Sequence, residues 1–214
     1  MKIVIFGAAG RIGQRIVNEA LARGHAVTAG LRDVARLARL ERRHAALEKI
    51  VADATVPAEI ARIATGHAAA ISAIGPGTGG DVGVIVAAAR ALIAGLPAAG
   101  LRRLLVVGGA GTLEIRPGVQ RIDTPEYPEM YRPSGYAQKA ALELYRQSAL
   151  DWSYLSPPVI IEAGRRSGRY RLGGDAVLAD AAGRSRISME DYAVAVLDEI
   201  ETPHHLRARF TVAD

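Results

Sequence analysis

The sequence contains no cysteine among its 214 residues. This absence excludes disulfide bonds, thiolate nucleophiles, cysteine-ligated zinc and iron–sulfur clusters. Aromatic residues make up only 5% of the chain, whereas half of it is hydrophobic. Such a composition favours a core of alanine and branched aliphatic residues between helices and a sheet over a β-sandwich. Length and composition together predict one α/β domain that spans residues 1–214.

Lysine and uninterrupted hydrophobic runs are also scarce. Of the 27 basic residues only Lys2, Lys49 and Lys139 are lysines, and the net charge is +5. The arginines are spread along the chain without a known nucleic-acid motif, so we expect no nucleic-acid partner. The longest apolar stretch, 82–101, is interrupted by Arg90 and Pro97 and predicts a buried helix rather than a membrane span. The chain starts on an apolar run with no leader pattern, and we therefore expect a cytoplasmic protein without membrane contact.

The histidines and the longest charge run favour ordinary structural explanations. The histidines have no spacing typical of a metal site, so we expect none; they are His25, His44, His67, His204 and His205. The run RLARLERRHAALEK, residues 36–49, places its charges at helical spacing and predicts a solvated helix face.

Apolar runs alternate with helical patterns along most of the chain. This alternation predicts a doubly wound, Rossmann-type parallel sheet with helices on both faces. The predicted strands are 2–6, 25–31, 47–51, 68–74, 103–108 and 152–156. The predicted helices are 11–23, 34–43, 57–65, 82–95 and 135–149. Gly24 is expected to end the first helix in a left-handed conformation, and Pro57 to begin another.

Two segments interrupt the alternation and are expected to lie on the substrate side. Residues 109–133 contain four prolines and are too long for an ordinary strand–helix connection, which is typical of a lid or substrate wall. Residues 157–186 are rich in glycine and arginine and predict a small C-terminal excursion of loops and short strands. After it, Ser188 is expected to cap a helix that ends near Glu201, and 209–212 form a last strand.

Three glycines stand where the first predicted strand turns into the first predicted helix, in the pattern Gly7-x-x-Gly10-x-x-Gly13. In that position glycines serve the turn itself, the approach of a ligand phosphate to backbone N–H groups, and close packing of helix on sheet. A pyrophosphate at the helix N-terminus would be stabilised by about 0.3–1 kcal/mol, and Arg11 could add a charge-assisted contact. The pattern predicts a dinucleotide site, and the alternative is a packed turn without a ligand.

The end of the second strand indicates which dinucleotide is preferred. An arginine there accepts the 2′-phosphate of NADP, whereas a carboxylate binds the ribose 2′-hydroxyl of NAD, and the sequence has Arg32 and Asp33 side by side. Asp33 has an alternative role as the N-cap of the following helix. We therefore expect NADP(H) to be preferred over NAD(H). Asp53, just after the third strand, is a candidate for the adenine amino group or merely a polar residue at a strand end.

Several blocks of the sequence carry a family resemblance that covers nearly the whole chain. They are IFGAAGRIGQRIVNEALARGH, LRD, VVGGAGTLE, DWSYLSPPVIIEAG, RSGRYRLGGD and SRISMEDYAVAVLDEIE. Together they resemble the NADH-flavin reductase group of the atypical short-chain dehydrogenases, which is similar to biliverdin reductase B and to NmrA-like proteins. The resemblance implies a Rossmann-type fold and a nicotinamide cofactor more firmly than it implies a reaction.

The resemblance also implies a set of cofactor-binding residues. The pyrophosphate would be bound by Gly7, Ala9, Gly10, Arg11, Ile12 and Gly13, the adenosine end by Arg32 and Asp53, the ribose and diphosphate by Ser72, Ala73, Ile74 and Gly75, and the nicotinamide by Gly108, Gly109, Thr112, Ser156, Pro157 and Pro158. Ile74 and Pro157 have an alternative role in packing only, and Ser72 as a strand end.

Short-chain dehydrogenases that reduce carbonyls use a Tyr-x-x-x-Lys pair, which this sequence lacks. In SGYAQKAALE, Tyr136 and Lys139 are only three residues apart, so a helix turns the tyrosine by about 100° from the usual position. If Lys139 has the family position, Gly135 stands where the tyrosine would be. Lys139 remains a candidate for the ribose. Thr112, Tyr131 and Tyr136 are candidates for acceptor contact, with ordinary surface roles as their alternative.

These observations support two functions of different classes. The first is an oxidoreductase that transfers hydride from NADPH to a flavin such as FMN or to another planar acceptor, because flavin reduction needs no catalytic tyrosine. The second is an NmrA-like regulator that binds NADP(H) as a redox sensor without turnover. A sugar-nucleotide epimerase is disfavoured because its chemistry needs the displaced tyrosine. The sequence leaves open whether the protein is a monomer or a homodimer.

Overall fold

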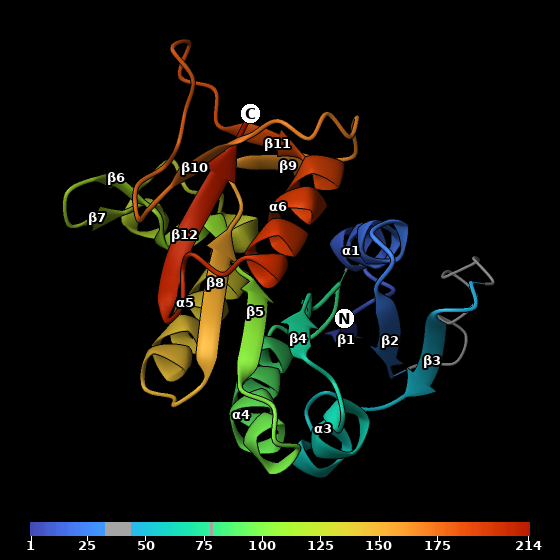
Figure 1. The fold of residues 1–214 in the computed structure, drawn as a ribbon. Helices are drawn as coiled ribbons and strands as arrows, with labels where there is room; N and C mark the ends of the chain where they lie inside the picture. Colours follow the sequence, from blue (N-terminus) through green and yellow to red (C-terminus); the bar gives the residue numbers. More distant parts are fainter. Residues whose placement is uncertain (33–43, 78) are drawn as a thin grey trace.

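The computed structural model describes residues 1–32, 44–77 and 79–214. Within this part the chain forms an eight-stranded sheet with helices on both faces (Figure 1). In spatial order its strands are β10 (Arg171–Gly173), β12 (Ala208–Ala213), β8 (Asp151–Ser156), β5 (Arg103–Val107), β4 (Ala69–Ser72), β1 (Lys2–Phe6), β2 (Ala26–Leu31) and β3 (Leu47–Val51). Among these eight strands, only β10 is antiparallel to its neighbour. The predicted doubly wound α/β fold is confirmed. The predicted helix 34–43 and the N-cap role of Asp33 lie outside the described residues. The helix face predicted for 36–49 is wrong at its described end, because residues 47–49 belong to β3.

The chain reverses its direction across the sheet between β1 and β4. From β1 it proceeds outward through β2 and β3, and it then returns to the other side of β1, where β4 pairs with β1 and β5 with β4. The end of β1 pairs with the end of β4, Phe6 opposite Ser72. In open α/β sheets such a reversal point, at the carboxyl ends of the strands, is where ligands bind.

The two faces of the sheet are covered by different helices. One face packs against α1 (Arg11–Ala22) and α6 (Met189–Glu201), and the other against α3 (Pro57–Ala64), α4 (Gly83–Ala98) and α5 (Arg132–Arg146). Along β1, Ile3 and Ile5 belong to the first core and Val4 and Phe6 to the second, and all four are fully buried. A continuous apolar run is therefore required where alternating side chains face two buried layers.

Local signals place several helix ends as predicted. Gly24 follows α1 with a φ of +79°, and Pro57 lies in the first turn of α3. Ser188 caps α6, because its hydroxyl accepts a hydrogen bond of 2.9 Å from the backbone N–H of Asp191. The carboxylate of Asp191 turns outward from the helix and accepts hydrogen bonds from the backbone N–H groups of Ser167 and Gly168.

Two helices differ from the prediction in their bounds: α4 ends three residues later, at Ala98, and α5 keeps its predicted length but is shifted three residues toward the N-terminus, to Arg132–Arg146. Helix α4 continues to Ala98 with Pro97 in its last turn, whereas residue 95 was predicted as its end. A proline in the last turn removes a single N–H donor, and the chain leaves the helix directly afterwards, with Gly100 at φ +73°. Helix α5 begins at Arg132, because Pro133 in its first turn lacks only an N–H that would have no partner inside the helix.

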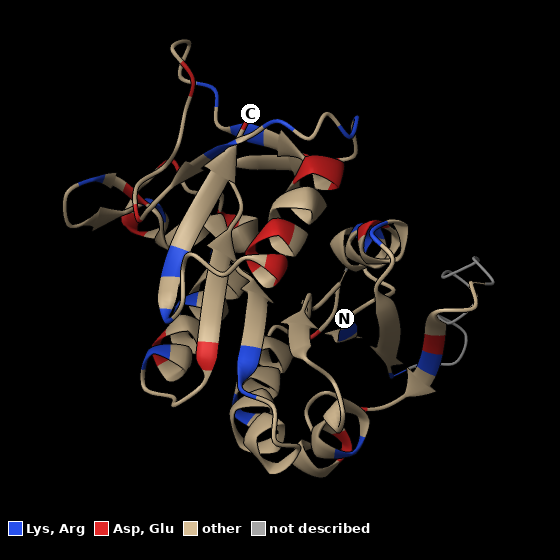
Figure 2. Cartoon of the chain, in the orientation of Figure 1, with Lys and Arg blue, Asp and Glu red and all other residues tan. Residues whose placement is uncertain are grey.

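The two predicted substrate-side segments lie at the end of the sheet toward which β5, β8 and β12 point (Figure 1). Residues 109–133 form short turns and a hairpin; these are η1 (Ala110–Thr112), β6 (Glu114–Arg116), β7 (Val119–Gln120), η2 (Arg121–Asp123) and η3 (Glu129–Tyr131). Residues 157–186 contain β9 (Ile160–Glu162), which pairs with β11 (Arg186–Ser188), and β10. Basic and acidic residues are distributed over several elements (Figure 2).

Candidate functional site

Gly7 forms the turn between β1 and α1. Its φ is +77°, a conformation that side chains disfavour. A Cβ atom at this position would lie 2.5 Å from the backbone oxygen of Ala73, directly after β4. Gly7 is therefore required by the meeting of two backbone segments at the reversal point of the sheet.

Gly13 and Gly10 have different neighbours within the same turn. A Cβ on Gly13 would lie 2.2 Å from the carbonyl oxygen of Gly7, so glycine lets α1 pack directly on the turn. A Cβ on Gly10 would lie 3.2 Å from that same oxygen, and Gly10 has an ordinary φ of −70°. The protein's own packing thus accounts for Gly7 and Gly13 but only weakly for Gly10.

The N-terminus of α1 fits an anionic group. Gly10 is the N-cap residue, no side-chain hydrogen bond caps the helix within the described residues, and both Gly10 and Arg11 are exposed. The uncapped backbone N–H groups and the helix dipole favour a phosphate there. Ile12 packs partly against the first core, and the carbonyl of Ala9 accepts a hydrogen bond from Gln14. The turn can therefore hold the pyrophosphate of a dinucleotide.

Arg32 and Asp53 lie together at the ends of β2 and β3. These ends are joined by a hydrogen bond of 2.9 Å from the Ala52 N–H to the Leu31 carbonyl. Arg32 is exposed, and its charge contributes to a lowered pKa of the Asp53 carboxyl. Burial raises that pKa, but the hydrogen bonds from the backbone N–H and hydroxyl of Thr55, 2.8 and 2.7 Å long, outweigh it together with Arg32. Asp53 is thus ionised, beside an exposed guanidinium.

The predicted residues after β4 lie next to the glycine turn. Ser72 is buried at the end of β4, and the Ala73 N–H donates to the Phe6 carbonyl at 2.9 Å. Ile74 packs against the second core, in agreement with its alternative role in packing, and Gly75 is exposed. This segment therefore continues the edge of the site from β1 toward β5.

The ends of β5 and β8 form the predicted nicotinamide end. The Gly108 N–H donates to the Leu155 carbonyl at 2.8 Å, and a Cβ on Gly108 would overlap the ring of Tyr154 at 2.1 Å. Gly109 lies against the side chain of Gln138 on α5. Ser156 is buried, and its hydroxyl has no hydrogen-bond partner among the described residues. Such an unpartnered buried group fits a polar ligand at this edge.

Pro157 and Pro158 are buried directly after β8. Across the sheet, the predicted cofactor residues thus follow the strand order β3, β2, β1, β4, β5, β8 along one edge. Neighbouring strands are about 4.8 Å apart, so roughly 14 Å separate the ends of β2 and β5. The site is an extended strip that can hold an extended ligand.

Thr112 is engaged in a contact that the sequence did not reveal. Its side chain is 2% exposed, and its hydroxyl and carbonyl oxygens both accept hydrogen bonds from Arg209, at 3.0 and 2.6 Å. Arg209 also donates to Asp175 at 2.6 Å. A direct contact between Thr112 and a bound acceptor stays a prediction, and this geometry favours a structural role for the hydroxyl.

Gly135 is buried in the first turns of α5, and its correspondence to the family tyrosine stays a prediction that depends on Lys139 having the family position. A Cβ at this position would lie 2.6 Å from Cδ1 of Ile122 and 2.8 Å from the hydroxyl oxygen of Tyr127. The ring of Tyr127 lies beneath the guanidinium groups of Arg121 and Arg132, 4.9 and 5.8 Å from its centre. Residues of the 109–133 segment therefore occupy the space that a side chain at position 135 would need.

The other candidates on this side lie near the start of α5. Tyr136 is 48% exposed and Tyr131 is 54% exposed. Lys139 is half-exposed, with its Nζ 3.8 Å from Oδ2 of Asp123 in η2. Both tyrosines can reach solvent, and Lys139 is held loosely by a carboxylate of the 109–133 segment.

The 157–186 segment is attached to α1 by a bidentate ion pair. Arg166 donates two hydrogen bonds of 2.8 Å to Glu19, whose side chain is 6% exposed and which also accepts from Arg23. The hydrogen bonds from Arg166 are the largest cause of the lowered pKa of Glu19; those from Arg23 add to it, and burial opposes it. On α6, Glu190 accepts from the Gly164 N–H at 2.7 Å. These contacts hold the segment against the helices beside the glycine turn.

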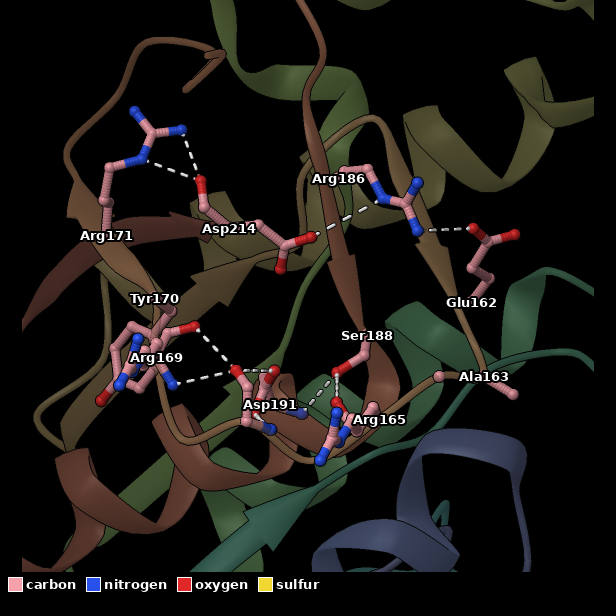
Figure 3. Close-up of a pocket in the computed structure, with 12 residues that line it drawn as sticks. Glu162, Ala163, Arg165, Arg169, Tyr170, Arg171, Arg186, Ser188, Asp191 and Asp214 are labelled. Carbon is pink, nitrogen blue, oxygen red and sulfur yellow. Dashed lines mark hydrogen bonds and ion pairs between the residues drawn. The ribbon is translucent and has the colours of Figure 1, made fainter.

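A cavity of about 500 Å³ lies within this segment, between β9, β11 and the N-terminus of α6 (Figure 3). Arg186 bridges Glu162 and Asp214 in its wall, and Asp191 accepts a hydrogen bond of 2.8 Å from the Ser167 hydroxyl. None of the predicted cofactor residues lines this cavity. It is therefore separate from the strip of predicted cofactor residues along the sheet edge.

Comparisons with known proteins agree with this geometry. The profile of a family described as NAD(P)H-binding matches residues 7–203. The chain belongs to this NAD(P)H-binding family. The match includes the glycine turn and the ends of the strands described above, and the family is oxidoreductase-like.

Several full-length relatives are similar to the chain. The uncharacterized protein YwnB of Bacillus subtilis is 42% identical over 99% of this chain and 98% of its own. A Streptococcus pneumoniae structure provisionally named an NADH-flavin reductase is 33% identical, with a TM-score of 0.86 over 100% of this chain and 99% of its own. A Burkholderia pseudomallei structure provisionally named an exported protein is 40% identical, with a TM-score of 0.90 over both whole chains. The predicted resemblance to the NADH-flavin reductase group is confirmed.

Residues 1–32, 44–77 and 79–214 contain neither a membrane-spanning helix nor a metal-binding cluster. In this part of the chain no helix is long and apolar enough to cross a membrane. In the same part, no cluster of three histidine, aspartate or glutamate side chains is placed to hold a metal ion. The cytoplasmic location stays a prediction, and one relative is named as exported.

Proposed function

We propose that the protein is an NADPH-dependent reductase that transfers hydride to a flavin or a similar planar acceptor. The observation that carries this proposal is the order of groups along the sheet edge. An exposed arginine lies at β2, a helix N-terminus without a side-chain cap follows β1, and a buried hydroxyl lies at β8 with no partner, the last two as judged over residues 1–32, 44–77 and 79–214. This order matches the adenosine, diphosphate and nicotinamide parts of an extended dinucleotide.

The preference for NADPH rests on Arg32. Its guanidinium is exposed at the end of β2, and the neighbouring Asp53 carboxylate keeps the charge of the pair balanced when no phosphate is bound. A hydrogen bond from Arg32 to the 2′-phosphate would contribute about 1.5–3 kcal/mol, a preference of roughly tenfold to a hundredfold over NADH. The oxygen Oδ2 of Asp53 accepts no hydrogen bond from a described residue, and we assign it to the adenine amino group.

The flavin class of acceptor rests on Gly135. If Lys139 has the family position, glycine stands where related reductases have the tyrosine that protonates a carbonyl, and the side-chain ends of Ile122 and Tyr127 lie close to it. The bound nicotinamide supplies a hydride, which a flavin accepts at N5 while water supplies the remaining proton. The residues of the site then only need to bind and orient the two planar groups.

The acceptor-side residues take supporting roles in this proposal. The side chain of Lys139 would turn from Asp123 to the ribose. It can do so because the 3.8 Å between its Nζ atom and Oδ2 of Asp123 is longer than a hydrogen bond. Tyr131 and Tyr136 offer exposed rings for contact with a planar acceptor. Thr112 would support the nicotinamide end through its backbone.

A direct assay tests the proposal. NADPH oxidation is followed at 340 nm with FMN, FAD, riboflavin and a set of quinones, each against a protein-free control, and NADPH binding is measured separately by calorimetry. We expect binding and acceptor-dependent oxidation. Binding without oxidation of any acceptor would instead support the second candidate, and no binding would refute both.

The second candidate is an NmrA-like sensor that binds NADP(H) without turnover. The same lack of a tyrosine at position 135 supports it, because a sensor needs no proton donor. Tight binding that differs between NADP⁺ and NADPH, with no hydride transfer, would favour it.

For the biological setting we propose a cytoplasmic protein with a small-molecule acceptor and no nucleic-acid or membrane partner. We propose a monomer or a homodimer, which sedimentation of the purified protein distinguishes from larger assemblies. Fractionation of the native host, with an exported marker as reference, tests the location.

A further inference from the structure

Arg209 on β12 links two segments that are far apart in the sequence. Its side chain is 4% exposed. One end of its guanidinium, Nη1, donates to the carbonyl and hydroxyl oxygens of Thr112 at 2.6 and 3.0 Å, and Nε donates to the carboxylate of Asp175 at 2.6 Å. The third nitrogen, Nη2, also contacts Asp175. We call these three residues the Arg209 clamp.

The clamp joins the two substrate-side segments. Thr112 ends η1, which follows the predicted nicotinamide residues Gly108 and Gly109, and Asp175 belongs to the 157–186 segment. The segments also pair through their backbones, because the Glu114 N–H donates to the Asp175 carbonyl at 2.9 Å and the Glu114 carbonyl accepts from residue 177 at 2.8 Å. The η1 turn is therefore tied to the 157–186 segment in two ways, by the backbone pairing at Glu114 and through the side chain of Arg209.

All three nitrogens of Arg209 are engaged by protein oxygens, so the guanidinium has no free group for a ligand. Arg209 must act through the residues that it holds. A planar and rigid guanidinium sets both distance and angle between two partners, which a lysine does not. We propose that Arg209 is a positioning residue for hydride transfer: the clamp holds the β5–η1 turn where nicotinamide and acceptor meet. This inference rests on the proposed function.

Asp175 offers the mildest way to test the clamp. Its side chain is 61% exposed, so Asp175→Asn removes a charge without leaving a cavity. Asp180 gives a matched control in the same segment, since it also pairs with an arginine, Arg184, at 2.8 Å but has no hydrogen bond to η1. Arg209→Lys and Arg209→Met complete the set, with lysine as the conservative variant.

The first readout is independent of turnover. Hydrogen–deuterium exchange of the backbone in residues 108–114 is measured for each protein without NADPH. We expect faster exchange in Asp175→Asn and Arg209→Met than in wild type, and unchanged exchange in Asp180→Asn. Unchanged exchange in Asp175→Asn would overturn the inference whether or not the protein is a reductase.

The second readout separates positioning from stability. For each variant we measure the NADPH dissociation constant, kcat and KM for FMN, and the primary isotope effect with NADPH deuterated at the transferred position. A displacement near 1 Å costs up to about a hundredfold in rate, so we expect kcat of Asp175→Asn to fall about tenfold. NADPH affinity should stay within about twofold, and the isotope effect should increase as hydride transfer becomes slower.

The possible outcomes distinguish this inference from the proposed function. Arg209→Lys should retain more of kcat than Arg209→Met. If Arg209→Met does not fold, the result for Asp175→Asn alone tests the positioning role of Arg209. A lower melting temperature with unchanged kcat and isotope effect would overturn the inference while leaving the reductase intact. A wild-type protein that binds NADPH but reduces no acceptor would refute the proposed function, and the inference with it.

Discussion

The three glycines of the β1–α1 turn should respond differently to the same substitution. In Gly13→Ala the new methyl group would lie 2.2 Å from the Gly7 carbonyl oxygen, against about 3.4 Å for an ordinary contact, so α1 must move away from the turn. Overpacking of this kind costs about 3 kcal/mol or more when the neighbour is backbone. For a chain of this length that corresponds to a melting temperature lower by roughly 6–12 °C.

Gly10→Ala should instead leave the fold nearly unchanged. Its φ of −70° suits alanine, and the nearest atom would be 3.2 Å away, so the tight contact and the reduced entropy of the unfolded chain nearly cancel, within about 1 kcal/mol. The methyl group would, however, stand where phosphate oxygens approach the helix N-terminus. We expect NADPH affinity to fall by tenfold or more, about 1.4 kcal/mol.

Thermal unfolding and NADPH calorimetry on the two variants check this contrast. Gly174→Ala is the matched control, because a Cβ there has no atom within 4 Å and Gly174 has no positive φ. We expect wild-type stability and affinity for the control. The reasoning is refuted if Gly13→Ala melts like wild type, or if Gly10→Ala binds NADPH as tightly as the control does.

Three further substitutions test other parts of the site and fold. Arg32→Ala should weaken NADPH binding by roughly tenfold to a hundredfold and leave NADH binding nearly unchanged, as calorimetry with both nucleotides would show. Gly135→Ala should lower the free energy of unfolding by about 1–3 kcal/mol, measured by urea denaturation, because its methyl group meets Tyr127. Glu199 has a lowered pKa: burial raises it, but the hydrogen bonds from neighbouring donors outweigh burial, so its stabilisation is present above the unfolded value of 4.5 and is lost as the pH falls through the folded pKa. Glu199→Gln should therefore flatten the loss of stability on acidification. It should also destabilise the protein by about 1.5–3 kcal/mol at pH 7, because it removes the carboxylate charge that pairs with the buried Arg103, although Arg103 keeps its hydrogen bonds to the Glu199 and Asp151 carbonyl groups and to the Ser153 hydroxyl. An acid limb as steep as that of wild type would contradict this.

The sequence predicted the features that depend on neighbours along the chain. β1 and β3 have the predicted bounds, and the positive φ of Gly24 and the Ser188 cap follow from local geometry. The alternation of apolar runs with helical patterns was sufficient for the doubly wound fold, because each element must bury one face. The errors at the end of α4 and at the start of α5 lie at prolines, whose effect depends on their place within the helix, whereas no proline accounts for the earlier end of α5 at Arg146.

The features that the sequence could not reveal depend on residues far apart in the chain. Gly108 is required by the ring of Tyr154, and Thr112 is held by Arg209, which is 97 residues away. A single sequence contains no signal for which distant side chain fills the space beside a glycine or bonds to a threonine. The sequence shows where the glycines are, but it does not show which neighbouring atoms require them.

These packing relations divide the site into two parts with separate controls. The protein's own backbone fills the space beside Gly7 and Gly13, so in our proposal the diphosphate and adenosine are recognised by the helix N-terminus, Arg32 and the Oδ2 atom of Asp53. In our proposal the Arg209 clamp controls the nicotinamide end, beyond the end of β5 and roughly 14 Å from β2. Changes that are more than about 10 Å apart and share no partner usually add in free energy. Arg32→Ala and Asp175→Asn should therefore combine additively, the first in NADPH affinity and the second in kcat, and a double variant whose losses are not additive would show that the two ends of the site are coupled through the sheet.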